Sequence, residues 1–164
     1  MTTTTTHTLA PGEGRRADLV NLGNRYMIES AQTDGRFALI EHTIAPRKLA
    51  APMHTHERED EYSFILAGRM GAQIGDEVVE AGPGELVFKP RGVPHAFWNA
   101  GDEECRLLEL ISPGDFAAYF TELAPVLTSE QPDFAKLAEI QARYGLSMDM
   151  DSIGRLMEQH ALEP

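Results

Sequence analysis

The sequence predicts an all-β domain, an antiparallel sandwich or barrel, that is followed by an α-helical C-terminal appendage. Three observations support this fold class. Between residues 19 and 112 the chain is made of short runs rich in Val, Ile, Phe, Leu and Tyr, spaced roughly ten residues apart. Turn sequences such as Asp34-Gly35 and Gly75-Asp76 separate these runs. After Ser112 the apolar residues change from the spacing of strands to that of helices.

The β part contains runs of strand length throughout, and a further strand is expected to carry His54 and His56. The expected strands are Arg25 to Ser30, Arg36 to Ile44, Tyr62 to Leu66, Gly71 to Ile74, Glu77 to Val79, Leu86 to Phe88, His95 to Trp98 and Arg106 to Ile111. Because the runs are short and follow one another closely, they favour antiparallel pairing over a parallel sheet with intervening helices.

Three helices are expected in the C-terminal part, over Asp115 to Leu123, Phe134 to Tyr144 and Asp151 to His160. Pro132-Asp133 opens the second helix and Gly145 ends it, as helix capping predicts. The chain therefore divides into a disordered tail over residues 1–18, a β-barrel over 19–112 and helices packing on the barrel over 113–164. These helices could also cover the open end of the barrel as a lid.

Composition indicates one soluble domain and excludes several kinds of partner. The 164 residues carry a formal net charge of -12, which would repel the phosphates of nucleic acids and anionic lipids. The single cysteine, Cys105, permits no internal disulfide, and the Thr-rich segment from Met1 to Gly14 lacks the apolar core of a secretion signal. No segment is long and apolar enough to span a membrane. We therefore expect a cytoplasmic protein that acts on a small molecule.

Two stretches of the β part carry residues suited to binding a metal. His54 and His56 are two residues apart, so on a strand both imidazoles project from one face. Glu61 opens the next strand-like run, and His95 opens another. Three imidazoles and one carboxylate form a site for one divalent transition metal (Fe, Ni, Mn, Co, Cu or Zn) and not for Ca or Mg. The bound metal would act as a Lewis acid toward an anionic oxygen.

The same residues resemble the two conserved motifs of the cupin superfamily. The first motif is matched by His54, His56, Glu61 and Gly68, and the second by Gly84, Pro90, Gly92, His95 and Asn99. One position departs from the pattern, because Lys48 stands where the first motif begins with a glycine. The resemblance covers about residues 35 to 112 and implies a jelly-roll β-barrel.

The intact ligand set makes the chain similar to single-domain cupins of the quercetin 2,3-dioxygenase type. This resemblance implies a dioxygenase that cleaves a flavonol or related enol with O2, in which Glu61 doubles as a general base. Such a role suits a carboxylate whose pKa is raised toward neutrality by an apolar site. The alternatives are a cupin isomerase, decarboxylase or lyase, and a non-enzymatic module that binds a small ligand or a metal. The resemblance also implies a homodimer.

Strand alternation suggests which side chains surround the substrate. Ser63 and Ile65 share the face of Glu61, and Phe97 shares the face of His95. If these faces point inward, Ile65 and Phe97 give the metal an apolar neighbourhood, which suits an aromatic or otherwise apolar substrate. We therefore expect Ser63, Ile65 and Phe97 to form part of the substrate pocket.

Overall fold

The computed structural model describes residues 8–164, which form two five-stranded antiparallel sheets and three α-helices. The first sheet has the order β1-β2-β9-β4-β7 and the second has the order β10-β3-β8-β5-β6. The strands of the first sheet are β1 (Gly23–Ile28), β2 (Ala38–Ile44), β9 (Cys105–Ser112), β4 (Asp60–Ala67) and β7 (Leu86–Lys89). Those of the second sheet are β10 (Leu146–Asp149), β3 (Leu49–His56), β8 (His95–Asn99), β5 (Met70–Ile74) and β6 (Glu77–Ala81).

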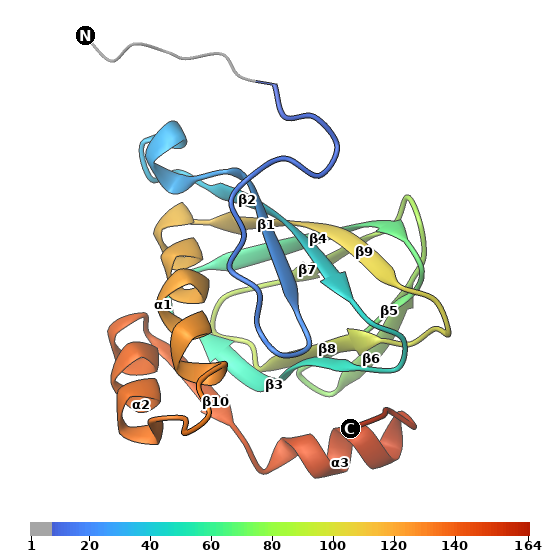
Figure 1. The fold of residues 1–164 in the computed structure, drawn as a ribbon. Coiled ribbons are helices and arrows are strands. Elements are labelled where there is room, and N and C mark those ends of the chain that lie inside the picture. The colour runs from blue at the N-terminus through green and yellow to red at the C-terminus, as the bar shows by residue number, and fades with distance from the viewer. Residues whose placement is uncertain (1–7) are drawn as a thin grey trace, which may run out of the picture.

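The chain crosses from one sheet to the other at most of its connections, which is consistent with a jelly roll (Figure 1). The fold class predicted from the sequence needs two corrections. Within residues 8–164 the strands pair as two separate sheets and do not close into a barrel. The protein is also not all-β, because the C-terminal part contributes three helices and an edge strand of the second sheet.

Most strands lie where the apolar runs predicted them, with ends that differ by a few residues. The strand β10 was not predicted, since Leu146–Asp149 is short and only Leu146 within it is buried. It pairs with β3, so that Leu146 lies opposite His56 and Met148 lies opposite His54. This pairing places the C-terminal part directly beside the two histidines of the first motif.

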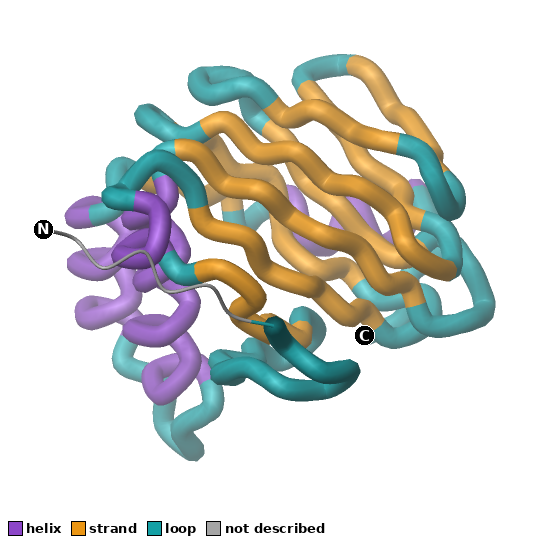
Figure 2. The backbone as a smooth tube through the Cα atoms, turned by 90° about the horizontal axis from the view of Figure 1, so that it is seen from above, coloured by secondary structure: helices purple, strands orange, loops and turns teal. Residues whose placement is uncertain are grey.

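The helices cover two different surfaces of the sheets (Figure 1). The chain forms a short 3-10 turn, η2 (Gly114–Ala117), and then α1 (Ala118–Leu127), α2 (Phe134–Arg143) and α3 (Ser152–Gln159), while another turn, η1 (Ser30–Thr33), follows β1. In the view from above, α1 and α2 gather beside one end of the strands (Figure 2). No helix among residues 8–164 is long and apolar enough to cross a membrane.

The apolar core has two parts. The larger part fills the space between the sheets and extends to η2 and α1, through buried residues such as Ile40, Ile65, Leu107 and Phe120. The smaller part packs α3 against the second sheet and consists of Leu49, Met53, Ala96, Trp98, Leu156 and Leu162. Burying both surfaces of the second sheet holds β3 and β8, the two strands that carry histidines of the motifs, between two apolar layers.

The N-terminal segment was expected to be disordered over residues 1–18. Residues 1–7 lie outside the described residues. Residues 8–18 run beside the first sheet, where Arg16 forms an isolated bridge with Arg25 of β1 and Ala17 is buried. The backbone amide of Tyr26 also donates a hydrogen bond to the carbonyl oxygen of Arg15, which anchors this segment to β1.

Candidate metal centre

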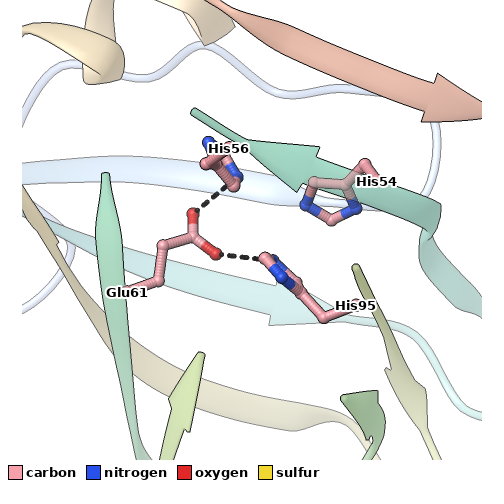
Figure 3. Close-up of side chains that lie close together, drawn as sticks. All are labelled: His54, His56, Glu61 and His95. Carbon is pink, nitrogen blue, oxygen red and sulfur yellow. Dashed lines mark hydrogen bonds and ion pairs between the residues drawn. The ribbon is translucent and has the colours of Figure 1, made fainter. Parts of the chain in front are cut away.

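The four residues of the motifs come together from three strands of two sheets (Figure 3). His54 and His56 lie on β3, and His95 lies on β8 directly opposite His54 in the register of the second sheet. Glu61 lies on β4 of the first sheet and faces the histidines across the interior. The motif residues are therefore close in space because the two sheets pack against each other.

Ligand atoms from His54, His56, Glu61 and His95 all lie within 4.8 Å of one another. The two carboxylate oxygens of Glu61 face different imidazoles: Oε2 is 3.2 Å from His95 Nε2 and Oε1 is 3.5 Å from His56 Nε2. All four side chains are buried. This convergence of three imidazoles and a carboxylate is a metal-binding cluster.

The imidazoles are held so that their Nε2 atoms can face a common ion. The Nδ1 atom of His54 is 2.8 Å from the Pro52 carbonyl, and that of His95 is 3.1 Å from the Val93 carbonyl. On His56, Nδ1 lies 3.5 Å from Glu59 Oε2 without forming a hydrogen bond, so of the three rings only those of His54 and His95 are hydrogen-bonded through Nδ1 to a described residue. A metal-bound histidine usually has such a partner on its other nitrogen, which fixes the tautomer and the orientation of the ring.

Two further observations fit a metal in this cluster. Neither ring nitrogen of the buried His56 has a hydrogen-bond partner among the described residues, although buried polar atoms are nearly always bonded. Burial, together with the neighbouring histidines, holds the pKa of His54 well below its usual range, and burial also lowers the pKa of His95. Both rings are therefore neutral near pH 7, the form in which imidazole binds a metal.

Glu61 has charged neighbours that the sequence analysis did not foresee. The ammonium of Lys89 lies 2.9 Å from Glu61 Oε2 and 2.9 Å from Glu109 Oε2, and the hydroxyl of Ser63 donates to Glu109 Oε2 at 2.7 Å. Lys89 and Glu109 are fully buried. The sequence does contain a signal that Glu109 is buried. Side chains alternate between the two faces of β9, so Glu109 lies on the same face as the apolar Leu107 and Ile111.

These neighbours correct the expected titration of Glu61. Burial alone would raise the pKa of the Glu61 carboxyl, but Lys89 and the histidines outweigh it and hold this pKa well below its usual range. Glu61 is therefore ionised at neutral pH, which suits a metal ligand. This environment therefore does not give Glu61 the near-neutral pKa of a general base, which we had expected from an apolar site.

The metal-binding cluster opens into an apolar cavity of about 170 Å³. The cavity lies between the inner side of β2 and β3 and the C-terminal helices. Its lining includes the ligands His54, His56 and Glu61, the aromatic residues Phe97, Phe116, Tyr119 and Phe120, and aliphatic residues such as Leu123, Leu137 and Leu146. The helices therefore form one wall of the cavity that adjoins the cluster.

The three residues expected in the substrate pocket lie in different places. Phe97 lines the cavity. Ser63 and Ile65 are completely buried and are not among its lining residues. Both side chains share the inward face of β4 with Glu61, but Ser63 binds Glu109 and Ile65 packs into the core between the sheets. The apolar lining that we expected from Ile65 is instead provided by the aromatic residues of η2 and α1.

The fold and the cluster define this chain as a metal-binding protein built on two packed antiparallel sheets. Residues 40–111 match the family described as the cupin domain. A protein from Streptomyces coelicolor, described as uncharacterized, is 34% identical over 89 residues, which cover 54% of this chain and 77% of that protein. The chain belongs to the cupin superfamily.

Solved structures share the same fold. The polyketide cyclase RemF from Streptomyces resistomycificus superimposes with a TM-score of 0.57 and 28% identity, over 66% of this chain and 80% of that chain. A predicted oxalate decarboxylase from Thermotoga maritima superimposes with a TM-score of 0.59 and 16% identity, over 65% and 98% of the two chains. Because the Thermotoga protein is only 16% identical, its similarity shows a shared cupin fold and nothing about function.

Proposed function

We propose that the protein is a metal-dependent enzyme that acts on a small aromatic enol or polyketide-like compound. One observation carries this proposal: three ligands of the metal-binding cluster, His54, His56 and Glu61, also line the apolar cavity. A ligand in the cavity would therefore meet the metal directly. Phe97, Phe116 and Phe120 offer aromatic surfaces to its rings, and apolar walls with a few polar groups are typical of small-molecule sites.

The four ligands fit one divalent ion from the group Fe, Ni, Mn, Co, Cu or Zn. Such an ion, when bound, supplies a Lewis acid that stabilises an enolate or phenolate oxygen. The residues of this chain set the charge around the ion and keep water away from it. Glu61 contributes a single ligand charge, and Lys89 partly offsets that charge at Oε2, the oxygen that also lies 3.2 Å from His95 Nε2. The aromatic wall excludes water and strengthens electrostatic interactions in the site.

The reaction class that we place first is the Lewis-acid class, which includes cyclisation, isomerisation and lyase chemistry on a keto or enol substrate. The sequence analysis placed an oxygenase first, with Glu61 as general base. Two observations change this order. The Glu61 pKa is held low, which weakens it as a base, and the identity with the polyketide cyclase RemF is high enough to favour a related substrate class.

The alternative within the same site is a quercetin 2,3-dioxygenase-like oxygenase. It is supported by the complete set of three histidines and one glutamate and by an aromatic cavity able to take a flavonol ring. This alternative requires a proton acceptor other than Glu61, or a substrate whose hydroxyl is already ionised. Consumption of O2 separates it from the Lewis-acid class.

The test uses the purified protein, loaded separately with Zn, Fe, Mn, Co, Ni and Cu. An aryl 1,3,5-triketone is supplied without oxygen, and its cyclisation with loss of water is followed by absorbance. Quercetin is supplied in air, and O2 uptake is recorded with an electrode. Anaerobic cyclisation that the His54→Ala/His95→Ala variant lacks supports the proposal. Uptake of O2 with quercetin favours the oxygenase, and binding without any turnover would show a binding module instead.

The proposed assembly is a homodimer formed through the outward face of the first sheet, next to its β7 edge. Within residues 8–164, β7 is the last strand of this sheet and has no strand on its outer side. Its outward face and that of β4 are apolar: Phe64, Leu86 and Phe88 are each at least 40% exposed, and Tyr62 stacks on Phe88. A second copy of the chain could cover this patch by a self-complementary contact. Light scattering should give twice the mass of 18.1 kDa, and Phe88→Glu should halve it.

A further inference from the structure

The cavity contains polar groups that the metal-binding cluster does not use. Besides the ligands, the polar side chains that line it are His42, Tyr119 and Gln141. His42 comes from β2 and is only 2% exposed. Its Nδ1 atom has no hydrogen-bond partner among the described residues. Because an unpaired buried acceptor is unfavourable, each such atom in a folded protein calls for a partner or a function.

The surroundings of His42 define what its free nitrogen can do. The backbone of Gly23 lies close enough to interact with one nitrogen of the ring, which leaves the other nitrogen as a possible acceptor. Burial, reinforced by the positive charge of Lys89, lowers the pKa of His42 to about 4. The imidazole is thus neutral at pH 7, and the ring nitrogen that carries no proton is an acceptor.

Aromatic rings surround this acceptor. The ring of Phe97 lies 6.3 Å from that of His42, and the ring of Phe120 meets it edge to face at 5.7 Å. Neither ring can donate a conventional hydrogen bond. The neutral acceptor therefore lies in an apolar surface beside the metal-binding cluster, and the same cavity reaches both.

We propose that His42 is a specificity-determining residue whose imidazole accepts a hydrogen bond from a hydroxyl group of the bound ligand. The proposal rests on the proposed function, because it places that ligand in the cavity next to the metal-binding cluster. It narrows the substrate class to compounds that combine an aromatic or enol skeleton with a separate hydroxyl donor. A ligand that lacks this donor leaves the acceptor nitrogen of His42 without a partner and binds more weakly.

Tyr119 gives the opposite wall a second polar group. It lies on α1, is 3% exposed, and its hydroxyl has no well-formed hydrogen bond, although the Gln141 side chain lies beside it. A series of rings links it to the metal-binding cluster, since Phe116 meets His56 at 4.4 Å and stacks on Tyr119 at 5.0 Å. The cavity thus offers polar groups on both walls and apolar rings between them, as a hydroxylated aromatic compound requires.

The test compares two probes with the same ring system: 2-naphthol, which has a hydroxyl donor, and 2-methoxynaphthalene, in which a methyl group replaces the hydroxyl hydrogen. Binding of each to the Zn-loaded protein is measured by calorimetry, for the wild type, His42→Phe and His42→Asn. We expect His42→Phe to weaken 2-naphthol binding by about tenfold and to leave 2-methoxynaphthalene binding unchanged. His42→Asn keeps an acceptor oxygen and should retain part of the preference for 2-naphthol.

The matched control is His160→Phe, which also removes an imidazole with a buried, unpartnered nitrogen, although His160 itself is half-buried. His160 stacks on Trp98 at 4.0 Å and does not line the cavity, so this variant should bind both probes as the wild type does. Equal loss of both probes in His42→Phe, or no loss of 2-naphthol, would overturn the proposal. Failure of the wild type to bind either probe would also overturn it.

A measurement on the wild-type protein tests the role of His42 even if the His42→Phe variant does not fold. In protein labelled with ¹⁵N-histidine, a ring-nitrogen resonance of His42 should shift when 2-naphthol is added and stay in place with 2-methoxynaphthalene. A resonance that 2-naphthol leaves unmoved contradicts the inference. Both experiments measure binding alone, so they separate the role of His42 from the proposed enzymatic function, which is judged by metal content and turnover.

Discussion

The ammonium of Lys89 lies 2.9 Å from Glu61 Oε2, so a fully buried cation contacts a ligand of the metal-binding cluster. The contact follows from the sheet register, because Lys89 on β7 pairs with Glu61 on β4. On the other side Lys89 meets Glu109 of β9, whose neighbour in the register, Ser63, donates to it. A charged network thus extends from the cluster into the first sheet.

Removing the cation of this network should destabilise the fold. In Lys89→Met, the carboxylates of Glu61 and Glu109 stay buried without their shared partner, and breaking a buried ion pair in this way costs about 3–5 kcal/mol. Urea denaturation of the metal-free protein measures the loss. The control is Lys136→Met, because Lys136 forms an exposed pair with Glu139 that should contribute less than about 1 kcal/mol. Similar losses in the two variants would contradict the structural role of Lys89.

Glu109 should give the protein a specific dependence of stability on pH. Burial raises its pKa from 4.5 to about 7, against the opposing effect of Lys89. Because the folded-state pKa lies above the unfolded one, the folded protein holds the proton more tightly. Its contribution to stability is therefore complete below pH 4.5 and is lost as the pH rises to about 7.

The variant Glu109→Gln cannot titrate, so its free energy of unfolding should fall less between pH 4.5 and 7 than that of the wild type. Urea denaturation of metal-free protein at a series of pH values measures this difference. Glu103→Gln serves as the control, since it makes the same substitution at an exposed position outside the charged network. A profile of Glu109→Gln that parallels the wild type between these pH values would rule out this titration.

The sequence predicted the features that depend on local spacing. Short apolar runs predicted most strands, and the spacing of the motif histidines and Glu61 identified the residues that the structure brings within 4.8 Å. Lys89 and Glu109 are 20 residues apart and meet only through the register of β7, β4 and β9, which local patterns do not determine. The same holds for β10, whose pairing with β3 brings the C-terminal part to the cavity.

The metal-binding cluster should bind one ion per chain. Elemental analysis of the purified protein is expected to find a transition metal that His54→Ala/His95→Ala lacks. Because an ion that binds only the folded state stabilises it, Zn at about a thousandfold excess over its dissociation constant should add about 4 kcal/mol to the free energy of unfolding. The variant should not gain this stability, whereas His160→Ala, outside the cluster, should gain it as the wild type does. Equal metal contents in the wild type and the double variant would show that the ion binds elsewhere.

Phe116 should be essential to the wall between the cavity and the core. It is 3% exposed, meets His56 edge to face at 4.4 Å and packs against Tyr119, Phe120 and Tyr144. Truncation to alanine removes these contacts and enlarges a cavity that the surrounding rings can only partly fill, so Phe116→Ala should lose about 3–5 kcal/mol of stability.

The matched variant is Phe134→Ala at the start of α2, because Phe134 is 73% exposed and its truncation should change stability by less than about 0.5 kcal/mol. Chemical denaturation compares the two. The enlarged cavity of Phe116→Ala should also accept 2-methoxynaphthalene at least as well as the wild type, since the substitution removes bulk and no polar partner. If Phe116→Ala loses as little stability as Phe134→Ala, then η2 does not hold Phe116 against His56 in solution. The helical wall of the cavity would then lie elsewhere than in this structure.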